Sequence, residues 1–286
     1  MAAIETPTGI LLGTFTPGTP EWDEARAGLC ITATQIAAVM GCSPWSNRFQ
    51  LWHAKSGLRV PPFVVTPQIE WGNRLEPAVG AKFADEHPEM ALAPTGTWRH
   101  QDRPWQRATP DLLGSELVEI KTSPVANEWD EGVPLHYYCQ AQWQLDTLGL
   151  DVCHVAVLIA GHDYREYVVE YDADDAATMR TAAEDFLATV LNGQRPAIDD
   201  SEITYNTIRV QPDRYDVIDV QIPPDLAELY ATRREYAKAA DAEYTEAKSL
   251  LLDALGNGRN AVIGDQRIAY RTARENGSTI ALQPAR

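Results

Sequence analysis

Hydrophobic residues recur with two different periods along the chain, and these periods indicate alternating helices and strands. Apolar positions three and four residues apart predict a helix over 69–86. An almost uninterrupted apolar run at 152–159 predicts a strand buried on both faces, and alternation over 164–171 predicts its antiparallel neighbour. Together these elements predict an α/β fold with a mixed central sheet flanked by helices.

Shorter signals complete the first two thirds of the chain. A threonine before residue 35 and Gly41 after residue 40 bracket a small helix. The apolar segments around 98–113 and 117–120 predict the strands of a meander. Further helices are expected at 21–26, between 43 and 57, at 134–148 and at 174–191.

The last third has a different pattern. Residues 199–224 are polar and irregular, which predicts a connector after a first domain over 1–198. From 226 to 255, small and apolar residues repeat every seven positions, which predicts one long helix with a narrow, alanine-rich seam. Residues 261–270 then predict a hairpin, so 225–286 is expected to form a C-terminal extension.

Composition limits the classes of protein that the chain can represent. No apolar run approaches the roughly 20 residues that a membrane span requires, and the N-terminus lacks the pattern of a signal peptide. Cys30, Cys42, Cys139 and Cys153 have no C-x-x-C spacing and are expected to be reduced thiols without a metal cluster. We therefore expect a cytoplasmic protein.

Charge gives a less direct constraint. The formal net charge of -17 opposes a nucleic-acid partner, because phosphate contacts need Lys and Arg. Most of this negative charge lies after residue 125, whereas the preceding part is close to neutral. A locally basic groove on an acidic protein therefore stays compatible with the sequence.

Candidate chemistry is concentrated between residues 109 and 121. Side chains at i and i+2 of a strand share a face, so Glu119 and Lys121 are expected to point together. A turn at 113–115 would return the strand that carries Asp111 to their side. Carboxylate oxygens suit Mg²⁺ or Mn²⁺, and an adjacent ammonium suits a water or a scissile phosphate. This pattern predicts a nuclease site.

Each of these residues also has a simpler interpretation. Glu-X-Lys on a strand is usually a solvated ion pair that contributes little to stability. Glu76, on the helix predicted at 69–86, could be a third acid of the site or a surface partner of Arg74 or Lys82. The glutamines of the 134–148 helix could contact DNA phosphates, orient water or simply keep the helix soluble; they are Gln140, Gln142 and Gln144.

Several short motifs, in this order along the chain, resemble the YqaJ-like viral recombinase family of PD-(D/E)XK nucleases, which includes phage λ exonuclease. The residues that resemble the nuclease motif itself are Pro110-Asp111 followed by Glu119-Ile120-Lys121. The resemblance covers roughly residues 20–195. The other motifs are Ile-Thr-Ala-Thr at 31–34, Ser-Pro-Trp at 43–45, Leu-Trp-x-x-Lys-x-Gly at 51–57, Gly-x-x-x-Glu at 72–76 and Tyr-x-Gln-x-Gln-x-Gln-Leu at 138–145.

The resemblance implies a Mg²⁺-dependent exonuclease that degrades one strand of linear duplex DNA from 5′ to 3′. The resulting 3′ overhang would pass to a single-strand annealing protein for recombination. Two metal ions are implied, with Asp111, Glu119, the Ile120 carbonyl and Glu76 as ligands, and with Lys121 orienting or activating the attacking water.

The resemblance also implies how DNA would be held. Arg26 and Thr34 correspond to the region that anchors the 5′-phosphate, and the three glutamines are candidate DNA contacts. It further implies a homo-oligomer, with a trimer as one form, in a bacterial host cell if the gene is carried by a phage. Two alternatives stay open, namely an endonuclease on the same fold and a non-catalytic DNA-end-binding protein.

Overall fold

The structure, a computed structural model, describes residues 5–16, 18–212, 214, 216–274 and 277–285. It divides into two compact units, Met1–Arg214 and Tyr215–Arg286. Both hydrophobic core clusters lie in the first unit, which also carries all the predicted site residues.

A five-stranded sheet with the order β3-β6-β7-β8-β9 forms the centre of the first unit. Strand β7 (Leu117–Ser123) runs parallel to β8 (Val152–Ile159), and every other neighbour in this sheet is antiparallel. The sheet is therefore mixed, as the sequence predicts. The remaining strands are β3 (Ala93–Pro94), β6 (Leu112–Leu113) and β9 (Asp163–Glu170).

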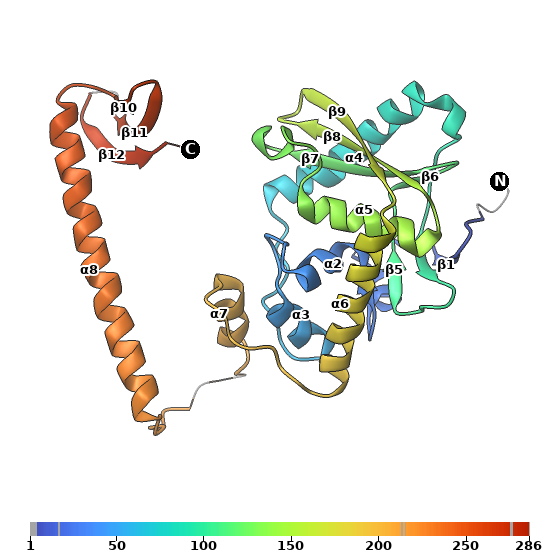
Figure 1. The fold of residues 1–286 in the computed structure, drawn as a ribbon, viewed down its shortest axis with the longest axis horizontal. Coiled ribbons are helices and arrows are strands. Elements are labelled where there is room, and N and C mark those ends of the chain that lie inside the picture. Colours follow the sequence, from blue (N-terminus) through green and yellow to red (C-terminus); the bar gives the residue numbers. More distant parts are fainter. Residues whose placement is uncertain (1–4, 17, 213, 215, 275–276, 286) are drawn as a thin grey trace. The chain divides into compact units, whose positions relative to one another are not determined.

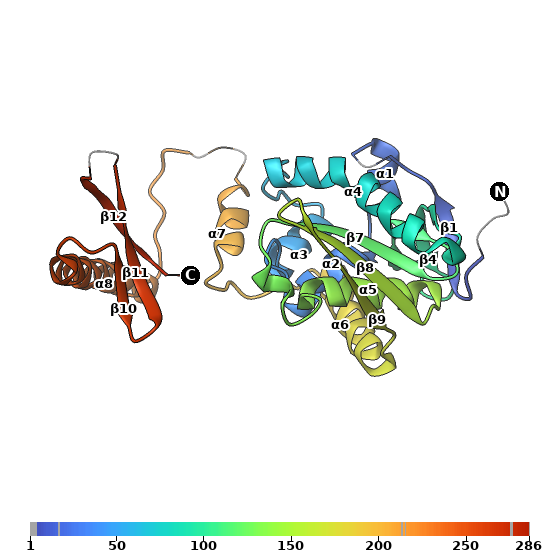
Figure 2. The ribbon, with the colours of Figure 1, turned by 90° about the horizontal axis from the view of Figure 1, so that it is seen from above.

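Two helices cover opposite faces of this sheet (Figures 1 and 2). Helix α4 (Pro67–Glu86) packs Val79 and Phe83 against the even-numbered residues Val118 and Ile120 of β7. Helix α5 (Leu135–Leu148) packs on the other face, which carries the odd-numbered residues of β7. Alternation along β7 thus directs Glu119 and Lys121 toward α5.

A second sheet, β1-β4-β5-β2, and the smaller helices pack around α5 in the larger core cluster. A capping box between Thr32 and Gln35 begins α2, and Gly41 ends it with φ 77°. These elements are β1 (Gly9–Gly13), α1 (Pro20–Arg26), β2 (Ile31–Thr32), α2 (Ala33–Met40), α3 (Arg48–Lys55), β4 (Thr97–His100), β5 (Gln106–Ala108) and α6 (Ala173–Leu191), with two single 3₁₀ turns at Pro88–Met90 and Asn127–Trp129.

The segment expected to be an irregular connector contains a helix, α7 (Glu202–Arg209). Its Thr204 and Thr207 are fully buried, and Asn47 donates a hydrogen bond of 2.8 Å to the Thr204 hydroxyl. The expectation of irregular structure is therefore wrong for this segment. The helix was not predicted because threonine counts as a polar residue in the sequence, although Thr204 and Thr207 form the buried face of α7. Helix α7 belongs to the first unit.

The second unit consists of one long helix and a small sheet. Helix α8 (Pro224–Leu255) has 32 residues and therefore extends about 48 Å. None of its residues is buried. The strands β10 (Asn260–Ile263), β11 (Gln266–Ala273) and β12 (Thr279–Pro284) pair antiparallel, so the predicted hairpin gains a third strand.

All four cysteines are free, with Cys42 only partly buried and its Sγ 3.8 Å from that of Cys139. Among the described residues, no helix combines the length and the apolar character that a membrane span needs.

Candidate active site

A tight hairpin brings Asp111 beside Glu119 and Lys121. Strands β6 and β7 pair antiparallel, with Leu113 opposite Leu117, and Asp111 stands immediately before β6. Gly114 makes the turn possible, because a Cβ at this position would lie 2.1 Å from the Met90 carbonyl oxygen. This turn gives the hairpin that the sequence predicts.

Glu119 is the most closely held side chain of the cluster. It is only 3% exposed and forms an ion pair with Lys121 Nζ. Gln140 Nε2 donates to Glu119 Oε1, and Gln144 Nε2 donates to Glu119 Oε2 at 2.7 Å. Two glutamines on one face of α5 therefore fix both oxygens of this carboxylate.

Asp111 and Glu76 complete a group of three acids. Asp111 Oδ2 accepts a hydrogen bond of 2.7 Å from the Ile120 backbone N–H. Burial, then the charges of Glu119 and Glu76, raise the pKa of Asp111 well above its usual range. Burial and the charge of Glu119 also raise the pKa of Glu76, which extends from α4. The helix and the hairpin thus bring three carboxylates within electrostatic reach of one another.

Lys121 supplies the positive charge of the cluster. Burial alone would lower the pKa of its ammonium, but Glu119 and Asp111 raise it above its ordinary value. The Nζ atom also lies 4.9 Å from the centre of the Tyr137 ring. One ammonium therefore stands beside three carboxyl groups.

This donor set fits a hard divalent cation. Carboxylate and carbonyl oxygens are the ligands that Mg²⁺ and Mn²⁺ prefer, and the Ile120 carbonyl lies between Glu119 and Lys121 in the chain. The carboxyl oxygens are not gathered around one point, however. In the described part of the chain, no three His, Cys, Asp or Glu side chains form a ready-made metal site.

The structure does not bring Gln142 to the cluster. Its side chain is fully buried, where Nε2 donates to the Glu170 carbonyl at 2.6 Å and Oε1 accepts from the Asp172 N–H at 3.0 Å. Gln142 therefore links α5 to β9 and the start of α6 instead of facing DNA. Gln140 and Gln144 are buried as well, so they reach Glu119 and not solvent, which does not fit the predicted direct DNA contact.

A second, basic cluster lies where α1, α3 and β5 meet. Arg26 Nη2 donates to the Thr34 hydroxyl at 2.9 Å, so the two predicted phosphate-binding residues do lie together. Lys55 feels the charges of both Arg26 and Arg107, although burial is the larger cause of its lowered pKa. Among the described residues, none of these three cations lies within 4.0 Å of a carboxylate.

Sequence reasoning missed two members of this basic cluster. Lys55 belongs to the Leu-Trp-x-x-Lys-x-Gly motif, which by itself indicates no phosphate contact. Arg107 has no local signal, because only the folded chain brings β5 next to α1. The Nε atom of Arg107 is buried without a hydrogen-bond partner in the described part of the structure. Unpaired buried donors of this kind can bind an anion.

Part of the chain matches a known protein family. Residues 21–151 match the model of the YqaJ-like viral recombinase domain. A search of curated proteins found no match.

Solved structures show the same fold. The alkaline exonuclease LHK-Exo from Laribacter hongkongensis is similar at 24% identity with a TM-score of 0.52, over 62% of this chain and 94% of that one. LHK-Exo in complex with dAMP is similar at 23% identity with a TM-score of 0.51, over the same shares of the two chains. The first unit therefore has a nuclease fold.

Proposed function

We propose that this YqaJ-like domain is a divalent-metal-dependent DNA exonuclease that degrades one strand of linear duplex DNA from 5′ to 3′. The observation that carries the proposal is that Glu76, Asp111 and Glu119 lie within electrostatic reach of one another and of Lys121, within a nuclease fold. Separate surface positions for these acids would have contradicted it.

Each residue has a distinct part in the proposed hydrolysis. Asp111, Glu119, the Ile120 carbonyl and Glu76 would hold Mg²⁺ or Mn²⁺, with two ions expected, and Gln140 and Gln144 would keep Glu119 in place. When bound, a divalent metal would supply charge neutralisation at the phosphate and would make water a stronger nucleophile. The Lys121 ammonium is placed to orient water and to stabilise charge that develops on the phosphate oxygens.

The basic cluster supports the proposed direction of digestion. Arg26, Lys55 and Arg107, with the Thr34 hydroxyl, offer donors to a terminal 5′-phosphate. Anchoring that end would place a neighbouring phosphodiester at the carboxylates, so digestion would proceed toward the 3′ end. The product would be a 3′ overhang suited to a single-strand annealing protein. The same proposal includes a homo-oligomer of this chain, with a trimer as one form.

A comparison of three variants tests the catalytic assignment. Asp111→Asn and Lys121→Ala should each abolish Mg²⁺-dependent digestion of linear duplex, whereas Lys82→Ala should behave as the wild type. Lys82 is the matched control because its exposed ammonium pairs with Glu86 and lies over the Tyr164 ring, so it belongs to neither of the two clusters. Full activity of both site variants would reject the proposal.

Closed circular DNA separates the exonuclease from its alternatives. An exonuclease leaves such a circle intact, an endonuclease nicks it, and a DNA-end-binding protein hydrolyses neither circle nor linear duplex. We expect digestion of the linear form alone.

A further inference from the structure

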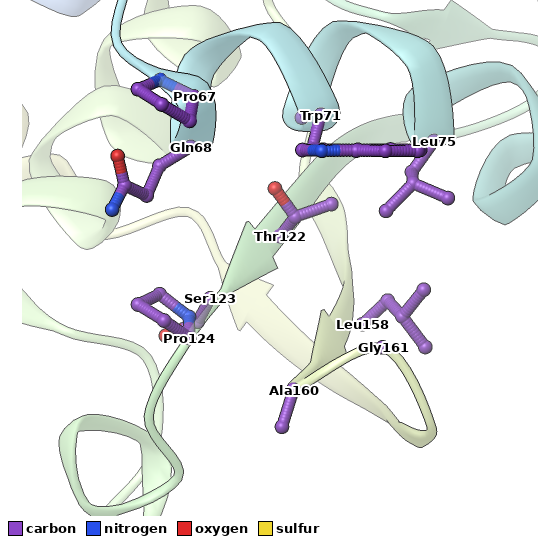
Figure 3. A pocket seen from close by; sticks show the side chains of 11 residues that line it. Pro67, Gln68, Trp71, Leu75, Thr122, Ser123, Pro124, Leu158, Ala160 and Gly161 are labelled. Carbon is purple, nitrogen blue, oxygen red and sulfur yellow. The ribbon is translucent and has the colours of Figure 1, made fainter.

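A pocket of about 320 Å³ lies one helical turn from Glu76 along α4, and none of the three acids lines it. It lies between the first turns of α4 and the ends of β7 and β8, with Trp71 and Leu75 on one side and Thr122 and Leu158 on the other (Figure 3). Its position and its lining differ from those of the carboxylate cluster, so it calls for a separate explanation.

The lining of this pocket is neutral. Its residues are apolar or uncharged, and neither Lys, Arg, Asp nor Glu is among them. Such a lining does not suit a phosphate, which binds where cations or charge-assisted donors are available. It suits a flat, mostly apolar group with a few polar atoms at its edge.

Trp71 gives the pocket a stacking surface. Trp71 is 62% exposed, although its indole is the largest ring system among the amino-acid side chains. In Figure 3 the indole is seen edge-on above the space that Thr122 and Leu158 border. Aromatic rings exposed in this way bind nucleobases by stacking, with little dependence on sequence.

Polar atoms stand at the edge of the same space. The Gln68 amide and the Thr122 hydroxyl line it, and neither forms a hydrogen bond with another described residue. Both can bond to the edge of a base that lies against Trp71. Gly72 keeps the space open, because a Cβ there would lie 3.1 Å from Thr122 Oγ1.

The position of the pocket identifies its occupant. Thr122 and Ser123 directly follow Lys121 on β7, and Gly72 precedes Glu76 by one helical turn on α4. The pocket therefore lies on the α4 face of the sheet, one helical turn from Glu76, and a strand whose phosphate bound near Glu76 would bring an adjacent base to it.

We propose that this pocket binds the base of a nucleotide next to the scissile phosphodiester, stacked on Trp71 with Gln68 and Thr122 at its edge. The assignment rests on the proposed nuclease function and goes beyond it, since it names the residues that hold a base of the strand being cleaved.

Kinetics with three full-chain variants provide the first test. Trp71→Ala should raise the concentration of linear duplex that gives half-maximal digestion by about 5- to 150-fold, the loss expected for one stacked base. Trp71→Phe keeps a ring and should stay near the wild type. Tyr205→Ala is the matched control, because Tyr205 is 63% exposed on α7 and does not line the pocket.

Fluorescence provides a second test that does not depend on turnover. In the Lys121→Ala background with Mg²⁺, 2-aminopurine placed at successive positions from the 5′ end should be quenched at one position near the active site. Adding Trp71→Ala should restore that fluorescence, whereas adding Tyr205→Ala should leave it quenched.

The results separate the two proposals. If the wild type digests linear duplex while Trp71→Ala shows unchanged half-saturation and unchanged quenching, the base-binding pocket is rejected and the nuclease assignment stands. An equal effect of Trp71→Ala and Tyr205→Ala also rejects the pocket. A wild type without any digestion rejects the nuclease assignment itself.

Discussion

Glu119 shows how a single side chain depends on its surroundings. The Glu-X-Lys spacing predicts that Glu119 and Lys121 share a face, and their ion pair agrees with that spacing. The spacing could not reveal that Gln140 and Gln144 hold both oxygens, because these residues come from a helix elsewhere in the chain. Identical residue types at 140, 142 and 144 therefore have different environments, which only the packing of α5 distinguishes.

A pair of glutamine variants tests this difference. Gln144→Leu should raise the Mg²⁺ concentration required for half-maximal digestion by about 10- to 100-fold, since it frees one oxygen of a proposed metal ligand. Gln142→Leu should leave that Mg²⁺ concentration unchanged. It should instead lower the free energy of unfolding by about 1–3 kcal/mol, because it leaves the Glu170 carbonyl and the Asp172 N–H unpaired.

Metal titrations and denaturant unfolding of both variants provide the measurement. The interpretation is wrong if the two substitutions change the metal requirement equally.

At the scale of elements, long periodic segments were predicted most accurately. The apolar run at 152–159 is β8 with the same limits, and the helix expected at 69–86 is α4, which begins two residues earlier at Pro67 after the Thr66 cap. Short elements were missed, since β1 and β3 have few residues and obtain their pairing partners from distant parts of the chain. Helix α7 was missed because its buried face is formed by threonines.

The β6–β7 hairpin leads to a prediction about its turn. Gly114→Ala should lower the free energy of unfolding by about 1–3 kcal/mol and reduce digestion, because the new Cβ would overlap the Met90 carbonyl and displace the strand that follows Asp111. Ser115→Ala is the control, since the contact at that position is made by its backbone N–H to Met90. Equal stability of both variants would contradict this account of the turn.

The basic cluster between α1, α3 and β5 leads to a prediction about how DNA ends are recognised. Arg107→Gln should reduce the preference for a 5′-phosphorylated over a 5′-hydroxyl end by about tenfold or more, which corresponds to one charge-assisted hydrogen bond. Arg74→Gln removes an equal charge from an exposed pair with Glu70 and should keep the preference. The rates on the two kinds of end provide the measurement, and a preference retained by Arg107→Gln would exclude this cluster as the phosphate anchor.

At the scale of the whole molecule, the two units differ in how they are built. Every residue of both hydrophobic core clusters belongs to the first unit, whereas α8 has no buried residue. The seven-residue repeat predicted helix α8, but it could not predict which surface packs against the alanine-rich seam of that helix.

This division leads to a prediction about truncation. A fragment of residues 1–214 should unfold in one cooperative transition and should digest linear duplex, because it retains both cores and all the proposed site residues. Thermal unfolding and digestion of the fragment, compared with the full chain, test this. An unfolded fragment would mean that the second unit is required for the stability of the first.

The central claim is that three acids and one lysine hydrolyse DNA with a divalent metal. A time course with 5′-phosphorylated, 3′-labelled linear duplex tests it most directly, with Mg²⁺ or with EDTA. Glu76→Gln is the test variant, and Glu70→Gln, on the exposed face of the same helix, is its control. We predict that the wild type and Glu70→Gln shorten the labelled strand progressively from its 5′ end only with Mg²⁺, while Glu76→Gln is slower by about tenfold or more. Digestion in EDTA, or equal rates for the two glutamate variants, would contradict the account.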